Sequence, residues 1–128
     1  MSQPLVVSII DDDISVRVAV ADIVRSMDLT ANAFASGHDF LRSSGLADTA
    51  CIVADVQMPG ISGIELQQAL SARALKIPMI FITAYPDERI RAKALDGGAI
   101  CFLDKPFGGS TIIECIERAL SARDLIKR

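Results

Sequence analysis

The chain has 128 residues, of which 51% are hydrophobic and 23% charged, and its formal net charge is −3. This length suits one domain with a substantial core, and the composition is that of an ordinary soluble globular protein. The acidic balance argues against a nucleic-acid-binding surface within the chain, because such a surface needs clustered basic residues. No apolar run approaches the roughly 20 residues that span a bilayer. The first residues also lack the basic start of a signal peptide, so we expect a cytoplasmic protein with no membrane partner.

The three cysteines, Cys51, Cys101 and Cys115, are widely spaced within apolar sequence. They form no Cys-x-x-Cys spacing of the kind that is typical of metal or redox sites. We therefore expect reduced, buried thiols.

Strand-like and helix-like segments alternate five times along the chain. Strands are expected at residues 5–10, 30–35, 51–55, 78–83 and 99–103, and helices at 15–27, 36–41, 63–75, 86–96 and 110–128. Ser15 is the expected N-cap of the first helix, and Pro86 is expected in the first turn of the fourth. The alternation predicts an α/β fold, a doubly wound five-stranded parallel sheet with five helices and the flavodoxin-like strand order 2-1-3-4-5.

The third expected strand ends on a carboxylate. Residues 51–54 are the apolar run of a strand buried on both faces, and Met58-Pro59-Gly60 then ends the strand. Asp55 thus lies at the carboxyl end of a central strand, where open α/β sheets bind their ligands. Taken alone, Asp55 could simply begin the turn.

Other strand ends carry matching polar side chains. These are Asp11, Asp12 and Asp13 after the first strand, Thr83 at the end of the fourth, and Lys105 after the fifth. Several carboxylates at one edge repel one another unless a cation lies among them, and oxygen ligands favour a hard cation, best of all Mg²⁺. A nearby hydroxyl and ammonium would suit a phosphoryl group, and a carboxylate can act as its acceptor. The pattern therefore predicts phosphorylation of Asp55.

Four segments at these strand ends resemble the receiver domain of two-component response regulators, especially FixJ-type receivers. They are residues 9–13, 54–63, 82–84 and 103–107. The resemblance extends over essentially the whole chain and implies a single receiver domain at residues 1–128. That domain would be either a stand-alone receiver or the N-terminal part of a longer regulator.

The resemblance implies a role for each residue of the expected site. Asp55 would accept the phosphoryl group from a phosphohistidine of a sensor histidine kinase, and Thr83 and Lys105 would hold the phosphoryl oxygens. The Mg²⁺ ligands would be Asp11 (directly or through water), Asp12, Asp55 and the backbone carbonyl of Gln57. Asp13 is expected to be a surface residue or a charge at the helix start.

The resemblance also implies a switch. The Lys105–Pro106 peptide would be cis. Phe102 would be a rotating aromatic that turns inward when Thr83 is drawn to the phosphoryl group; the alternative is a plain core residue. The output surface would be the fourth helix, fifth strand and fifth helix, through which the phosphorylated chain would form a homodimer. FixJ-type receivers usually precede a helix-turn-helix DNA-binding domain, so transcription regulation is the expected output.

Two positions depart from the commonest family pattern. Tyr85 lies two residues after the expected hydroxyl residue, and Gln57 lies two residues after the expected phosphoacceptor. In the family these positions flank the path of the attacking water. We therefore expect an altered lifetime of the phosphoryl group.

Two other functions remain open from the sequence. One is a Mg²⁺-dependent phosphohydrolase of the haloacid-dehalogenase type with Asp11 as its nucleophile, but Ile14-Ser15 does not fit that motif and the segment after Asp55 would be unexplained. The other is a degenerate receiver that only binds partners, against which the full set of polar residues argues. The expected receiver is not an enzyme in the usual sense, since it catalyses only its own phosphorylation and dephosphorylation.

Overall fold

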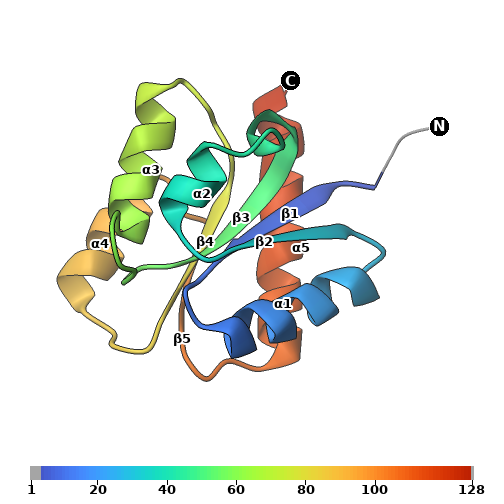
Figure 1. Cartoon of the computed structure of the whole chain (residues 1–128), viewed down its shortest axis with the longest axis horizontal. Helices are drawn as coiled ribbons and strands as arrows, with labels where there is room; N and C mark the ends of the chain where they lie inside the picture. The colour runs from blue at the N-terminus through green and yellow to red at the C-terminus, as the bar shows by residue number, and fades with distance from the viewer. Residues whose placement is uncertain (1–3, 128) are drawn as a thin grey trace.

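A computed structural model describes residues 4–127 (Figure 1). The elements run in the order β1 (Val6–Ile10), α1 (Ile14–Ser26), β2 (Thr30–Phe34), α2 (Gly37–Leu41), the short 3-10 helix η1 (Leu46–Asp48), β3 (Thr49–Asp55), α3 (Gly63–Ala72), β4 (Met79–Thr83), α4 (Glu88–Asp96), β5 (Cys101–Asp104) and α5 (Gly109–Lys127). All strand pairs are parallel, and the sheet order is β2-β1-β3-β4-β5. The predicted fold class, strand order and alternation are therefore confirmed. Across residues 4–127 we find no helix with the length and apolar character that a membrane crossing requires.

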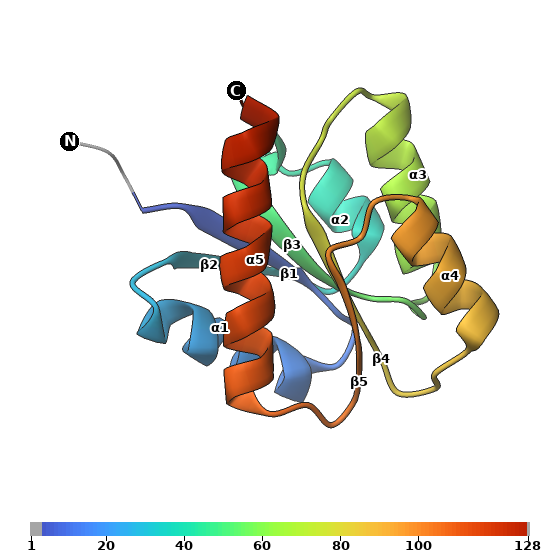
Figure 2. The same cartoon turned by 180° about the vertical axis from the view of Figure 1, so that it is seen from behind.

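The sheet is the middle of three layers. Helices α1 and α5 cover one face, as the view from behind shows (Figure 2), and α2, α3 and α4 cover the other. Every residue of β3 is buried, which explains the continuous apolar run that precedes Asp55. The three cysteines are free and buried, as predicted, in the core layer beneath α1 and α5.

Two helices begin differently from the prediction. Asp13, not Ser15, is the N-cap of α1, and its carboxylate accepts the backbone N–H of Ser15 at 2.9 Å and the Ser15 hydroxyl at 2.6 Å. A carboxylate is the stronger acceptor, so Ser15 serves as its donor. Pro86 was wrongly placed in the first turn of α4, because Asp87 is the N-cap and accepts the backbone N–H of Arg89 at 2.9 Å.

Helix α3 is set firmly against the end of β3. Its first turn has a capping box, in which the hydroxyl of Ser62 accepts the N–H of Glu65 and the carboxylate of Glu65 accepts the N–H of Ser62. A Cβ on Gly63 would lie 2.7 Å from the backbone oxygen of Asp55 and 2.9 Å from the ring of Phe81. Only glycine permits this approach, so the start of α3 directly supports the strand end that carries Asp55.

A second contact joins α3 to α4. The side-chain amide of Gln67 in α3 donates to the backbone carbonyl of Ala94 at 3.0 Å, and a Cβ on Gly97 would lie 2.7 Å from the same side chain. The C-terminal end of α4 is thereby fixed to α3.

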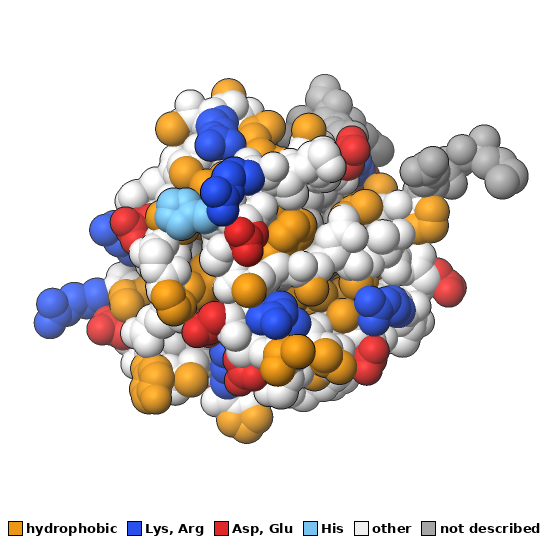
Figure 3. Space-filling model, in the orientation of Figure 1, with side chains coloured by type: hydrophobic (Ala, Val, Ile, Leu, Met, Phe, Trp, Pro, Cys, Tyr) orange, Lys and Arg blue, Asp and Glu red, His pale blue; other side chains and the backbone are white. Residues whose placement is uncertain are grey.

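Charges of both signs lie on the surface. On the face seen in Figure 3, Lys and Arg side chains are interspersed with Asp and Glu side chains and with hydrophobic ones. This mixture differs from the single-sign basic patch that is typical of a nucleic-acid-binding surface.

Candidate functional site

The strand register brings three predicted site residues to one edge of the sheet. Ile10 pairs with Ala54, and Asp55 pairs with Ile82, so the residues that follow these pairs emerge side by side. Asp11, Asp55 and Thr83 are buried there, with exposed fractions of 0%, 6% and 1%. Their neighbour Asp12 is exposed. The predicted convergence of the strand ends is thus present in the structure.

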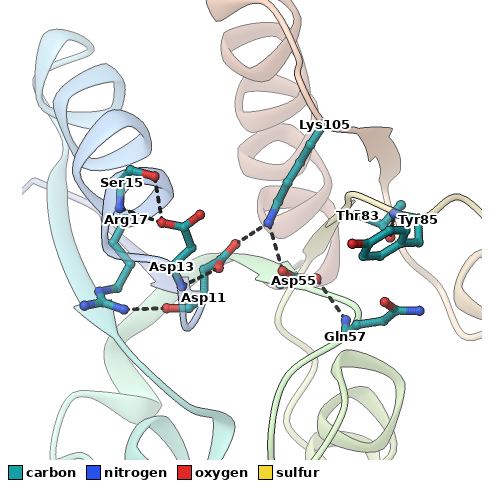
Figure 4. Close-up of polar contacts among 9 residues, drawn as sticks. All are labelled: Asp11, Asp13, Ser15, Arg17, Asp55, Gln57, Thr83, Tyr85 and Lys105. Carbon is teal, nitrogen blue, oxygen red and sulfur yellow. Dashed lines mark hydrogen bonds and ion pairs between the residues drawn. The ribbon is translucent and has the colours of Figure 1, made fainter.

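Lys105 lies between the two buried carboxylates (Figure 4). Its Nζ atom donates to Oδ2 of Asp11 and to Oδ2 of Asp55, both at 2.9 Å. The other oxygen of each carboxylate is held by a backbone N–H two residues on, from Asp13 and Gln57 respectively, again at 2.9 Å. Each carboxylate is therefore oriented by one fixed amide and one shared ammonium.

Burial and pairing act in opposite directions on the charges of this site. Burial raises the pKa of Asp11 above its ordinary value, and this outweighs the hydrogen bonds from the Asp13 amide and from Lys105. For Lys105, burial acts to lower the pKa, but hydrogen bonds to Asp55 and Asp11 raise it above the ordinary value. Lys105 is therefore an ammonium at neutral pH and supplies the positive charge that the buried carboxylates need.

Three carboxylates are close enough to share a metal ion. Asp11, Asp12 and Asp55 each offer one oxygen, and these oxygens all lie within 4.8 Å of one another. An oxygen-only set with one exposed member suits a hard cation that keeps some of its water, which is the preference of Mg²⁺. The residues present therefore fit such an ion.

Thr83 ends β4 next to this cluster. Its hydroxyl oxygen accepts the backbone N–H of Tyr85 at 3.1 Å, which fixes the turn that leads towards α4. The Tyr85 side chain is 73% exposed and lies at the rim of the site (Figure 4). Gln57, also labelled there, is exposed and contacts Asp55 through its backbone amide.

The remaining predicted features lie around β5. The Lys105–Pro106 peptide is cis, as predicted. Phe102 is half-buried, and its ring centroid lies 6.5 Å from that of Phe81 on the α3–α4 side of the sheet. A cavity of about 300 Å³ adjoins it, lined by Arg91 and Asp104 among others. The Asp13 side chain is exposed at the helix start, as predicted.

One contact of the site was missed in the sequence. The Arg17 guanidinium, in the second turn of α1, donates to the backbone carbonyl of Asp11 at 2.8 Å. The available signal was the spacing, since a long side chain four residues after a helix N-cap can reach back over the preceding turn.

Comparison with known proteins agrees with this geometry. The family described as the response regulator receiver domain matches residues 7–117. The transcriptional regulatory protein TdiR of Thauera aromatica is 38% identical over 115 residues, which cover 90% of this chain and 51% of that protein. The transcriptional regulatory protein FixJ of Azorhizobium caulinodans is 38% identical over 120 residues, covering 94% of this chain and 57% of that protein. The chain spans about half the length of these relatives.

Solved structures of response regulators are also similar to this chain. The response regulator StyR superposes with a TM-score of 0.88 at 36% sequence identity, covering 98% of this chain and 63% of that one. The structure described as FixJ-N superposes with a TM-score of 0.82 at 31% identity, covering 94% of this chain and 96% of that one. None of these similarities supports the phosphohydrolase alternative. The chain therefore belongs to the receiver domain family of response regulators.

Proposed function

We propose that Asp55 accepts a phosphoryl group from a phosphohistidine of a sensor histidine kinase. The observation that carries this proposal is the placement of Asp55 at a buried strand end, with Lys105 at 2.9 Å and two further carboxylates close enough to share a cation. The same placement makes Asp11 and Asp12, with Asp55 and the backbone carbonyl of Gln57, the proposed Mg²⁺ ligands. When bound, Mg²⁺ would offset the negative charge of the carboxylates and of the incoming phosphoryl group.

The transfer itself requires little more than orientation and charge. A carboxylate oxygen of Asp55 attacks phosphorus, the P–N bond to the kinase imidazole breaks, and its electron pair remains on the imidazole nitrogen, which takes up a proton. The Gln57 amide holds the carboxylate in position. Lys105 exchanges a carboxylate partner for a phosphoryl oxygen, and its ammonium stabilises the added charge.

The proposed switch begins at Thr83. Its hydroxyl is buried and now accepts the Tyr85 amide, and it would turn to donate to a phosphoryl oxygen. A contact that exists in only one state shifts the population towards that state. The half-buried position of Phe102 beside a cavity supports its role as the rotating aromatic.

The proposed partners use two surfaces. The side chains of Ile14 and Val18, which are 66% and 53% exposed on α1 near the site, offer an apolar surface to the kinase. The face formed by α4, β5 and α5 would form the homodimer after phosphorylation.

We further propose that residues 1–128 are a single cytoplasmic receiver domain of a longer transcription regulator and bind no nucleic acid themselves. The relatives TdiR and FixJ are transcriptional regulatory proteins and are longer than this chain, which supports its place within a longer transcription regulator.

Intact-mass spectrometry after incubation with a small phosphodonor and Mg²⁺ tests the proposal. The wild type should gain one acid-stable, base-labile phosphoryl group, and Asp55→Asn should gain none. Asp13→Asn is the matched control, because Asp13 is an exposed aspartate outside the cluster and should leave the modification intact. A phosphoryl group that persists in Asp55→Asn would refute the assignment.

The phosphorylated protein then tests the two unusual positions. Tyr85→Ala and Gln57→Ala should each change the decay rate of the phosphoryl group, since Gln57 contacts Asp55 and Tyr85 contacts the neighbouring Thr83 through their backbone amides. Decay rates equal to that of the wild type in both variants would contradict this part of the proposal. Size-exclusion chromatography of the same samples measures whether phosphorylation produces the dimer.

A further inference from the structure

We propose that Arg17 is a positioning residue for the acidic segment that follows β1. Its side chain holds Asp11 and Asp12 in the arrangement that a cation requires. The inference rests on the proposed function in so far as the cation is Mg²⁺. The Arg17 guanidinium donates a hydrogen bond to the backbone carbonyl of Asp11 at 2.8 Å.

Every polar group of Asp11 has one partner in the described structure. Its N–H donates to the carbonyl of Phe34 at 3.1 Å, and its two carboxylate oxygens accept the Asp13 amide and the Lys105 ammonium. Its carbonyl lies beyond the strand ladder, which ends at Ile10 on both sides, and accepts from Arg17. Because Asp11 is fully buried, its carbonyl has no contact with bulk water that could take the place of the Arg17 guanidinium.

Helix α1 places Arg17 for this contact. Asp13 caps the helix, and the backbone N–H of Arg17 makes an early intrahelical bond to the Asp13 carbonyl at 3.1 Å. Long side chains in helices point back towards the N-terminus, so Arg17 extends over the turn that it follows. Figure 4 shows its guanidinium on the side of Asp11 away from Asp55. The residue therefore joins the turn at positions 11–13 to the helix without entering the site.

The charge of Arg17 and its positioning contact would affect cation binding in opposite directions. A guanidinium near the site repels a bound cation, so its removal through charge alone would strengthen binding. The loss of a positioning contact instead frees the Asp11 carbonyl and misaligns the ligands, which weakens binding, as the loss of partners behind metal ligands typically does. The direction of the change therefore separates the two roles.

The test is the Mg²⁺ dissociation constant, measured by calorimetry well below the unfolding temperature of each variant. Arg17→Met, which keeps the length of the side chain and removes the donor, should weaken binding by about tenfold. Arg17→Lys keeps a donor and a charge and should restore part of the affinity. Arg25→Met is the matched control, because Arg25 is an exposed arginine in the same helix and should bind like the wild type. Affinity in Arg17→Met that equals or exceeds the wild-type value would overturn the proposal.

A second measurement needs no metal. The amide of Asp13, which donates to the Asp11 carboxylate, should exchange faster with solvent in metal-free Arg17→Met, as measured by NMR, whereas the Gln57 amide at Asp55 should not. Equal acceleration at both amides would mean a general loss of stability and would overturn the positioning role. If the wild type itself fails to bind Mg²⁺, the proposed function fails, while the two amides still decide the role of Arg17. If Arg17→Met does not fold, the solvent-exchange rates of the Asp13 and Gln57 amides are compared between Arg17→Lys and the wild type.

Discussion

The ammonium nitrogen of Lys105 lies 2.9 Å from Oδ2 of Asp55 and simultaneously 2.9 Å from Oδ2 of Asp11. One ammonium is thus shared by two carboxylates, of which that of Asp11 is fully buried. A cation bound by those carboxylates would compete with the Lys105 ammonium for the same two side chains. The resting site is therefore held together by the side chain that the proposed reaction requires to move.

The variant Lys105→Met should bind Mg²⁺ several-fold more tightly than the wild type, because the competing ammonium is gone. In the absence of metal it should also be less stable, by about 2 kcal/mol, since two carboxylates lose their shared counter-charge. Calorimetry measures the first effect and urea unfolding with and without Mg²⁺ the second. Lys93→Met, at an exposed lysine of α4, is the control and should change neither quantity. Weaker Mg²⁺ binding in Lys105→Met would mean that the ammonium orients the ligands more than it competes with the metal.

Gly63→Ala should destabilise the protein by about 2 kcal/mol, because a Cβ would overlap the Asp55 carbonyl and the Phe81 ring. Chemical denaturation measures the loss. Gly109→Ala, at a glycine whose added Cβ would have its nearest neighbour at 4.0 Å, is the control and should be neutral or stabilising. Equal effects of the two substitutions would refute the close approach of α3 to β3.

Ala74→Gly should stabilise the protein by about 1 kcal/mol. Ala74 follows the C-cap of α3 with a φ of 57°, and the N–H of Leu75 donates to the carbonyl of Leu70 at 2.9 Å, the pattern in which helices usually carry glycine. The midpoint of thermal or urea unfolding reports the gain. Ala72→Gly, at the last residue of the same helix, should instead destabilise the protein by up to about 1 kcal/mol. A loss at both positions would contradict the left-handed conformation of Ala74.

The capping box of α3 predicts a dependence of stability on pH. Hydrogen bonds from the backbone N–H of Ser62 and then from its hydroxyl lower the pKa of Glu65 below its ordinary value. A lowered carboxyl pKa adds stability above the unfolded pKa, and this stability is lost as the pH falls through the folded pKa. The wild type should therefore be more stable than Glu65→Gln at neutral pH, and the difference should vanish in acid below the ordinary value of 4.5. Glu117→Gln, at an exposed glutamate of α5, is the control, and an equal pH profile for both variants would argue against the capping box.

The strand ends could be predicted from the sequence because parallel strands bring their carboxyl ends to one edge. The buried run before Asp55 and the similar runs before Asp11 and Thr83 were sufficient to place these side chains together. Strand order and direction alone fix the edge of the sheet on which each of these side chains emerges.

Features that depend on competition between neighbours could not be predicted in this way. Asp13 and Ser15 are both good N-cap residues, and only the folded turn shows that Asp13 accepts and Ser15 donates. Similarly, Asp87 is the N-cap of α4, so the helix begins at Glu88 and not at the expected Pro86. The spacing of Arg17 after the helix N-cap shows that its side chain can reach the preceding turn, but not that it contacts the Asp11 carbonyl.

The attachment of α4 to α3 through Gln67 and Ala94 makes the two ends of α4 unequal. Its nine residues extend over about 13 Å at 1.5 Å per residue, with the fixed contact close to the C-terminal end. A shift of the loop that follows Thr83 acts on the opposite end, so the helix would pivot about Ala94 rather than slide. A displacement passed on by that loop would therefore be largest at Glu88 and smallest at Ala94.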